Sequence, residues 1–495
     1  MHEKLTEIFT KLSHIEHAIT FLQWDQLVMM PEKGNEKRSE ALAELHSIYH
    51  SILTDQETSA LVNEPYGTLP DEQKRAVAEM KRVWERATCL PPELVKKKSL
   101  AGSRCEFQWR KQREENNWPG FLENFKEVVS LAREEAQART NHSTHDYSCN
   151  YDAMLDLYCT GDSSTMINKI FAGLKAELPT LLQHIAQVHQ QRPVHPTGVF
   201  PIGQQKRLNS ELVRLLGFDF SQGRIDESKH PFSTGDFGDQ RITTRYTYDE
   251  FTESLKATAH ETGHASYEGG LPSKYVGLPV GSARNSCIHE SQSLLFEKQI
   301  LLSQPFLEFF TPTIHQYLPD AQIYNANQLW QSMTRVKPSF IRVDADEVSY
   351  PLHIILRYEI EKDLINGTVE PEDIPELWDQ KMFEYLGLRT TDDYRNGCLQ
   401  DIHWTDGSFG YFPAYTLGSI NSVQIFSAIK RAYPDWQARL LIGDVIFIRE
   451  WLEANIWSIG SLKDSQELIQ QATGEQTNSR YFLDYLKERY LDEAY

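Results

Sequence analysis

The chain has 495 residues, of which 40% are hydrophobic and 11% aromatic. This composition argues against a disordered protein and predicts a large folded core or an aromatic-lined cleft. The formal net charge of −20 would repel a phosphate backbone, so we expect no nucleic-acid partner.

The sequence also lacks the marks of export or membrane insertion. No run of 18 apolar residues occurs, and the N-terminus has no basic start followed by an apolar stretch. The six cysteines are scattered and form no C-x-x-C pair, which is typical of free thiols in a reducing compartment. We therefore expect a cytoplasmic protein with no membrane partner.

Apolar residues recur with helical period along most of the chain. The pattern predicts helices over 2–21, 37–54, 71–88 and 163–190, and two long helices within 92–139 that are broken near Pro119 and Gly120. It breaks between about 192 and 250, where loops and one strand, Arg241–Tyr248, are expected. Helical period then returns at Asp249 and continues to the C-terminus.

These elements predict a mainly α fold, a large helical body with a small β-sheet, built as one α-rich domain over residues 1–495. Two lobes around a cleft are one arrangement of such a body. No stretch is rich enough in glycine, serine or charge to predict a linker.

The most informative segment is His260-Glu-Thr-Gly-His264, an H-E-x-x-H motif. Residues four apart share one face of a helix, so both histidines can reach one metal ion. Glu261 lies beside them and is placed to act as general base in a metallopeptidase. The alternative is a surface helix that carries two solvated histidines.

Two histidines need a third protein ligand, because catalytic sites of this kind use three protein groups. Glu290 follows on the next predicted helix, after a loop rich in glycine and proline, and would give a His-His-Glu site of the thermolysin type. The third histidine of the longer metzincin motif is missing, since position 270 is glycine. His289 competes with Glu290, but it would point about 100° away around the helix.

Six short segments, in order, match the signatures of one family. They are His230–Thr234 (H-P-F-S-T), Asp239–Thr243 (D-Q-R-I-T), His260–His264 (H-E-T-G-H), His289–Gln292 (H-E-S-Q), Ile341–Asp346 (I-R-V-D-A-D) and Gly397–Trp404 (G-C-L-Q-D-I-H-W). On these segments the chain resembles the carboxypeptidase Taq family of metallocarboxypeptidases.

The resemblance implies a cytoplasmic, homodimeric enzyme that removes C-terminal residues from peptides with broad side-chain tolerance. It also implies a helical fold with a deep groove, similar to neurolysin and angiotensin-converting enzyme. The predicted strand directly precedes the H-E-x-x-H helix, so we expect the small sheet next to the active-site helix. Glu290 becomes the preferred third ligand of one divalent ion. Zinc is the first choice, and the His-His-Glu set also accepts cobalt or manganese.

Peptide hydrolysis also needs donors for the developing oxyanion and, in a carboxypeptidase, a cation for the terminal carboxylate. For the oxyanion we expect His403 with Tyr411 and Tyr415, although both tyrosines could be core aromatics. For the carboxylate we expect Arg342.

Other residues compete for these roles. Arg241 and Arg357 are rival carboxylate clamps, and Arg342 could instead form a structural ion pair with Asp344, Asp346 or Glu347. Arg241 lies on the predicted strand, where thermolysin-like enzymes add the substrate as a further strand. His230 is expected near the substrate.

Two other functions remain open. A metallo-oligopeptidase that cuts inside short peptides would use the same metal chemistry without a carboxylate clamp. A catalytically inactive, metal-stabilised binding protein would not need Glu261 as a base.

Overall fold

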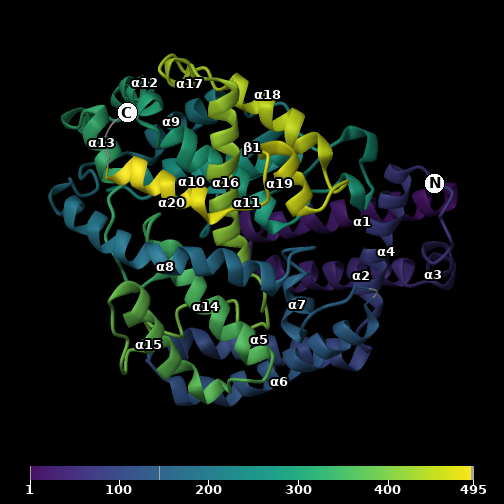
Figure 1. The fold of residues 1–495 in the computed structure, drawn as a ribbon. Helices are drawn as coiled ribbons and strands as arrows, with labels where there is room; N and C mark the ends of the chain where they lie inside the picture. The colour runs from purple at the N-terminus through teal and green to yellow at the C-terminus, as the bar shows by residue number, and fades with distance from the viewer. Residues whose placement is uncertain (1, 144, 492–495) are drawn as a thin grey trace.

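The computed structural model describes residues 2–143 and 145–491, and it is helical over most of that length (Figure 1). The first group of helices is α1 (Glu3–Val28), α2 (Asn35–Leu53), α3 (Gln56–Val62), α4 (Asp71–Thr88), α5 (Pro92–Glu114), α6 (Trp118–His142), α7 (Asn150–Leu155), α8 (Ser164–Val188) and α9 (Ile202–Leu215). The second group follows the sheet and comprises α10 (Thr252–Gly269), α11 (Ser286–Leu294), α12 (Gln304–Tyr317), α13 (Ala326–Met333), α14 (Tyr350–Ile365), α15 (Ile374–Leu386), α16 (Pro413–Ala432), α17 (Trp436–Leu440), α18 (Ile446–Asn455), α19 (Ser465–Thr473) and α20 (Ser479–Tyr490). Among the described residues, no helix combines the length and apolarity needed to cross a membrane.

A three-stranded sheet interrupts the helices, which confirms the predicted mainly α fold with a small sheet. Its strands β1 (Gly223–Glu227), β2 (Ser233–Asp236) and β3 (Asp239–Thr244) have the order β1-β3-β2. β3 pairs in parallel with β1 and antiparallel with β2. Because both edges of β3 are already paired, a substrate cannot add to it as a further strand, and that expectation for the strand of Arg241 is wrong.

Most predicted helices are confirmed to within a few residues, and 71–88 coincides with α4. The break in 92–139 was misplaced: Pro119 and Gly120 lie in the first turn of α6, where proline needs no hydrogen-bond donor. Asn117 caps this helix by accepting a hydrogen bond from the Gly120 amide at 3.0 Å. Helix α9 was not predicted, because the proline- and glycine-rich stretch before it made the whole segment resemble a loop.

Most of the buried apolar side chains of the described residues form two large clusters that meet at α11 and α16. Cys287 and Leu417 belong to the cluster built mainly from α5–α8, α14 and α15. Ile288 and Ile425 belong to the cluster built mainly from α9, α10, α12, α13 and α18. In Figure 1, α16 runs vertically through the upper group of helices and reaches down to α8. Helices α11 and α16 therefore lie on the boundary between the two cores.

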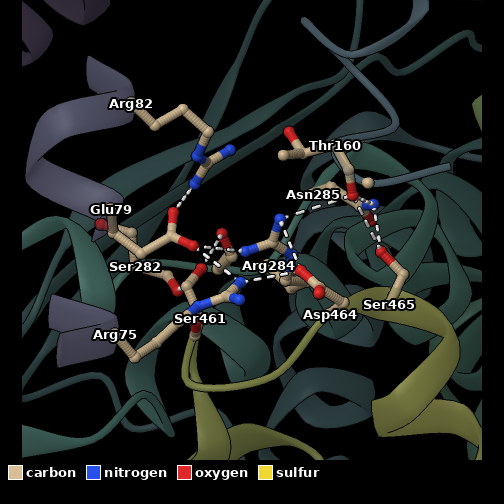
Figure 2. A network of polar contacts seen from close by, with 12 residues as sticks. Arg75, Glu79, Arg82, Thr160, Ser282, Arg284, Asn285, Ser461, Asp464 and Ser465 are labelled. Atoms are coloured by element: carbon tan, nitrogen blue, oxygen red, sulfur yellow. Dashed lines mark hydrogen bonds and ion pairs between the residues drawn. The ribbon is translucent and has the colours of Figure 1, made fainter. Parts of the chain in front are cut away.

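The N-terminal helices pack against the segment that joins α10 to α11. Side chains of α1, α3 and α4 form a third apolar cluster with Tyr275, Leu278 and Val280. A partly buried ionic network adds to this contact (Figure 2). Arg284, just before α11, donates to Glu79 of α4 at 3.0 Å. The start of α11 is thus held from the N-terminal side.

The same network extends to a third segment. Arg75 of α4 contacts Glu79 at 2.7 Å and Asp464, the residue before α19, at 2.9 Å, and Arg82 also pairs with Glu79. Arg284 lies 3.7 Å from Asp464. We call Arg75, Glu79, Arg82, Arg284 and Asp464 the arginine network.

Candidate metal centre and active site

Helix α10 presents the H-E-x-x-H motif. Its opposite side is anchored by the fully buried Leu255 and Ala259, so the two histidines are held on one face. Gly263, between the histidines, lies where α10 crosses α11. A Cβ atom there would lie 2.5 Å from the Gln292 carbonyl oxygen, so only glycine permits this close approach.

Helix α11 carries the third predicted ligand, Glu290. The helix is capped by Asn285, whose side-chain oxygen accepts from the Ile288 amide at 3.0 Å. On its other side, Gly418 of α16 lies against Glu290, and a Cβ at Gly418 would be 2.7 Å from the Glu290 Cβ. Close contacts at two glycines therefore fix α11 between α10 and α16.

The structure brings the three predicted ligands together. Glu290 Oε2 lies 3.7 Å from His260 Nε2 and 3.5 Å from His264 Nε2, and one ligand atom from each residue lies within 4.8 Å of the others. Two ligands of a tetrahedral zinc ion, each about 2.0–2.2 Å from the metal, would be about 3.3–3.5 Å apart. The donor set and its spacing therefore fit a single divalent ion.

The competing ligand, His289, lies behind His264 instead. Its Nδ1 is 2.6 Å from the Nδ1 of His264, and its Nε2 is 2.7 Å from Glu268 Oε1. One of its nitrogens therefore contacts the Nδ1 of the proposed ligand His264 and the other contacts Glu268, and His289 is not part of the three-residue set that converges.

Glu297 is a site residue that was not predicted from the sequence. It lies on a π-helix, Leu295–Leu301, that continues α11, and its Oε2 is 3.0 Å from His260 Nδ1. Burial alone would raise the pKa of Glu297, but Lys298 and His260 hold it well below its usual range. The spacing could have indicated this site residue, because Glu297 follows Glu290 by seven residues, or about two helical turns, and so lies on the same helix face.

Glu261 lines a cavity of about 310 Å³ together with His260, Glu290 and Tyr350. Only 6% of its surface is exposed. Burial raises the pKa of Glu261 to about 7, and the charges of Glu290 and Glu297 act in the same direction. A carboxylate with a pKa near neutrality is suited to accept and return a proton.

The predicted oxyanion donors also cluster. His403 Nε2 lies 3.4 Å from the Tyr415 hydroxyl, and the His403 ring is 5.5 Å from that of Tyr411. Burial lowers the pKa of His403 to about 4, and burial followed by the charge of Glu290 raises that of Tyr411 to about 12. All three groups are therefore neutral near pH 7.

Arg342 is 6% exposed and does not pair with the acids predicted as its alternative partners. Its Nε donates to Asp401 at 2.8 Å and its Nη1 donates to the Tyr350 hydroxyl at 2.8 Å. Tyr350 belongs to no motif of the sequence, although it lines the cavity beside Glu290.

The rival arginines are less suited to hold a substrate. Arg357 is completely buried and donates to the other Asp401 oxygen at 2.6 Å, so it has no surface open to a substrate. Arg241 pairs with Asp239 at 2.9 Å and stacks on Trp24 of α1. His230 is exposed in the loop between β1 and β2, apart from the described residues that line the cavity.

Comparison with known proteins identifies the family. The model of the carboxypeptidase Taq (M32) metallopeptidases matches residues 4–490. The chain belongs to this family. It is 35% identical to thermostable carboxypeptidase 1 of Thermus thermophilus, over 99% of this chain and 98% of that protein. Carboxypeptidase 1 of Bacillus subtilis is 33% identical, over 98% and 97% of the two chains.

Solved structures agree with this assignment. Metallocarboxypeptidase 1 of Trypanosoma cruzi matches with a TM-score of 0.96 and 38% identity, over 99% of each chain. The predicted enzyme class is confirmed: the chain is a metallocarboxypeptidase, a peptide hydrolase. Membership of the M32 metallopeptidases also implies a divalent metal ion.

Proposed function

We propose that this enzyme removes C-terminal residues from peptides with broad side-chain tolerance, with His260, His264 and Glu290 as metal ligands. The observation that carries the proposal is the convergence of these three donors at 3.5–3.7 Å beside the buried Glu261. Zinc is the first choice of ion, with cobalt or manganese as alternatives. When bound, the ion polarises the scissile carbonyl and activates the attacking water.

The protein's own groups then handle protons and charge. Glu261 accepts the proton of the attacking water and delivers it to the leaving amine. His403, Tyr411 and Tyr415 are neutral donors and stabilise negative charge on the carbonyl oxygen. His403 carries no positive charge near pH 7, because burial lowers its pKa to about 4.

Arg342 is the proposed clamp for the substrate's terminal carboxylate. A guanidinium offers five N–H donors in a planar fork, and the contacts with Asp401 and Tyr350 engage its Nε and Nη1. Asp401 is itself held by Arg357. These contacts hold the guanidinium against Tyr350, which lines the cavity, and leave further N–H donors for a carboxylate.

The test separates the carboxypeptidase from the oligopeptidase alternative. The parent enzyme should cleave a peptide with a free carboxylate far faster than the same peptide amidated at its C-terminus. Arg342→Ala should lower kcat/KM on the free acid by about 10- to 150-fold, as expected for a charge-assisted pair. It should have little further effect on the amidated peptide.

Arg241→Ala is the matched control, because Arg241 also pairs with a nearby aspartate. Equal rates on the two peptides with the parent enzyme would contradict the carboxypeptidase reading and favour the oligopeptidase. Coupling at Arg241 instead of Arg342 would change only the assignment of the clamp. Thermal midpoints of all variants check that the buried Asp401 contacts tolerate the changes.

We further propose a homodimer in the cytoplasm, as the family resemblance implies. Six free cysteines are consistent with a reducing compartment. Sedimentation equilibrium of the purified enzyme tests the dimer, and a monomer at micromolar concentration would contradict it.

A further inference from the structure

His264 is followed by a chain of contacts that leads away from the proposed metal site. Its Nδ1 lies 2.6 Å from His289 Nδ1, and His289 Nε2 lies 2.7 Å from Glu268 Oε1. The three side chains are largely sheltered, with 17%, 24% and 30% of their surfaces exposed. Tyr267 covers His289, with the two rings 5.3 Å apart.

The positions of these three residues on α10 and α11 explain why they contact one another. Glu268 is four residues after His264, so both lie on one face of α10. His289 directly precedes Glu290 on α11. The close crossing at Gly263 brings this histidine against α10. One turn of α11 thus supplies both a proposed ligand and a group behind another ligand.

Only one arrangement of protons in this chain suits metal binding. A cation at the Nε2 of His264 requires a lone pair there, so the neutral ring carries its proton on Nδ1. That N–H can donate only if His289 Nδ1 accepts. Neutral His289 then carries its proton on Nε2, which donates to the Glu268 carboxylate. The contacts at 2.6 and 2.7 Å match this sequence of donors and acceptors.

We propose that His289 and Glu268 are positioning residues that fix the tautomer and the ring orientation of His264 for metal binding. The inference rests on the proposed metal site. Partners of this kind behind a metal-binding histidine typically contribute 10- to 100-fold in metal affinity. His260 differs, because its Nδ1 contacts the Glu297 carboxylate directly at 3.0 Å.

The test measures metal affinity and not activity alone. Zinc dissociation constants are determined by chelator competition for the full-length enzyme and for His289→Ala, His289→Asn and Glu268→Ala. His289→Ala should weaken zinc binding by about 10- to 100-fold. His289→Asn should lose clearly less, because the amide oxygen can accept where Nδ1 did.

A double variant tests whether Glu268 acts on His264 through His289. Once His289→Asn has removed the link to Glu268, adding Glu268→Ala should cause little further loss of zinc affinity. In the cobalt-substituted enzyme, His289→Ala should shift the visible absorption bands while keeping the same coordination number. For the zinc-saturated variants, kcat should fall by a smaller factor than the zinc affinity does.

Unchanged zinc affinity in His289→Ala would overturn the inference, as would equal losses in His289→Ala and His289→Asn. A cobalt spectrum that reports one ligand fewer in His289→Ala would also overturn it, because His289 would then be a ligand itself. Glu290→Ala is the matched control on the same turn of α11 and should abolish tight binding. If Glu290→Ala binds zinc normally, the proposed metal site fails and not merely its positioning chain.

Discussion

The proposed metal site and the arginine network are both partly buried polar clusters, but their groups are satisfied in opposite ways. In the network, opposite charges face one another, with Arg75 and Arg284 contacting Glu79 at 2.7 and 3.0 Å. In the metal site, the short contacts of His260 and His264 are at Nδ1, at 3.0 and 2.6 Å.

On the other side of each imidazole, Nε2 faces Glu290 at 3.5–3.7 Å. That separation is too long for a strong hydrogen bond and fits two ligands that share an ion. In the metal site, a neighbouring side chain contacts the Nδ1 of each histidine, and both Nε2 atoms face Glu290. This arrangement distinguishes a binding site from a polar cluster that only stabilises the fold.

The largest effect is expected on the catalytic side of this comparison. Glu261→Gln removes the proton acceptor but leaves the three proposed ligands, so kcat should fall by about 10²–10⁴-fold while bound metal and thermal midpoint stay close to the parent values. Steady-state kinetics and metal analysis on the same sample measure this. Loss of the metal, or retention of most of the activity, would show that Glu261 has another role.

A substitution in the arginine network should lower the free energy of unfolding and leave kcat close to the parent value. Glu79→Gln leaves Arg82 and Arg284 facing a neutral group in a buried position, and it should lower the free energy of unfolding by about 3–5 kcal/mol. Urea denaturation measures this, with kcat measured in native buffer as the second readout.

Glu72→Gln on the same helix is the control, because Glu72 pairs with Lys274 at the exposed surface. It should change the free energy of unfolding far less than Glu79→Gln does, because solvent screens an exposed ion pair. Equal losses in the two variants would mean that burial does not determine the strength of the network.

Asp162 provides a contrast with Glu79 of the arginine network. Glu79 faces arginines, whereas the hydrogen-bond partner of Asp162 is neutral. Asp162 is buried and accepts a hydrogen bond from Gln466 at 3.0 Å. Burial raises the pKa of Asp162 from 3.8 to about 7. Between about pH 4 and pH 7 the folded protein therefore holds a proton that the unfolded chain has released, so stability falls as pH rises.

The measurement is the free energy of unfolding of the parent minus that of Asp162→Asn, at several pH values. This difference should decrease from pH 4 to pH 7 by at most about 4 kcal/mol. A difference that stays flat would indicate that Asp162 titrates normally in the folded protein.

The sequence predicted most of the fold and the proposed ligands, for identifiable reasons. The helices have clear apolar faces, and H-E-x-x-H fixes two ligands through the geometry of a single helix. Helix α9 and strands β1 and β2 were missed, because short elements in a segment rich in glycine and proline carry a weak periodic signal. The single-domain reading of residues 1–495 stays a prediction.

The contacts between distant segments could not be predicted in the same way. Asp401, which holds Arg342 in place, lies 59 residues further along the chain. The segment that carries Asp401 also packs against α14, where Trp404 and Gly410 donate to Glu361. Glu297 and the role of His289 likewise depend on how α11 crosses α10, which no local pattern encodes.

Gly418 has a consequence for how the active site tolerates change. Tyr415, a proposed oxyanion donor, lies about one turn before Gly418 on α16, and the backbone of Gly418 rests against Glu290. The spacing between carboxylate and phenol is therefore set by one helix–helix contact. Insertions in the intervening loops can accumulate without altering it, whereas a single added methyl group at Gly418 would push the two apart.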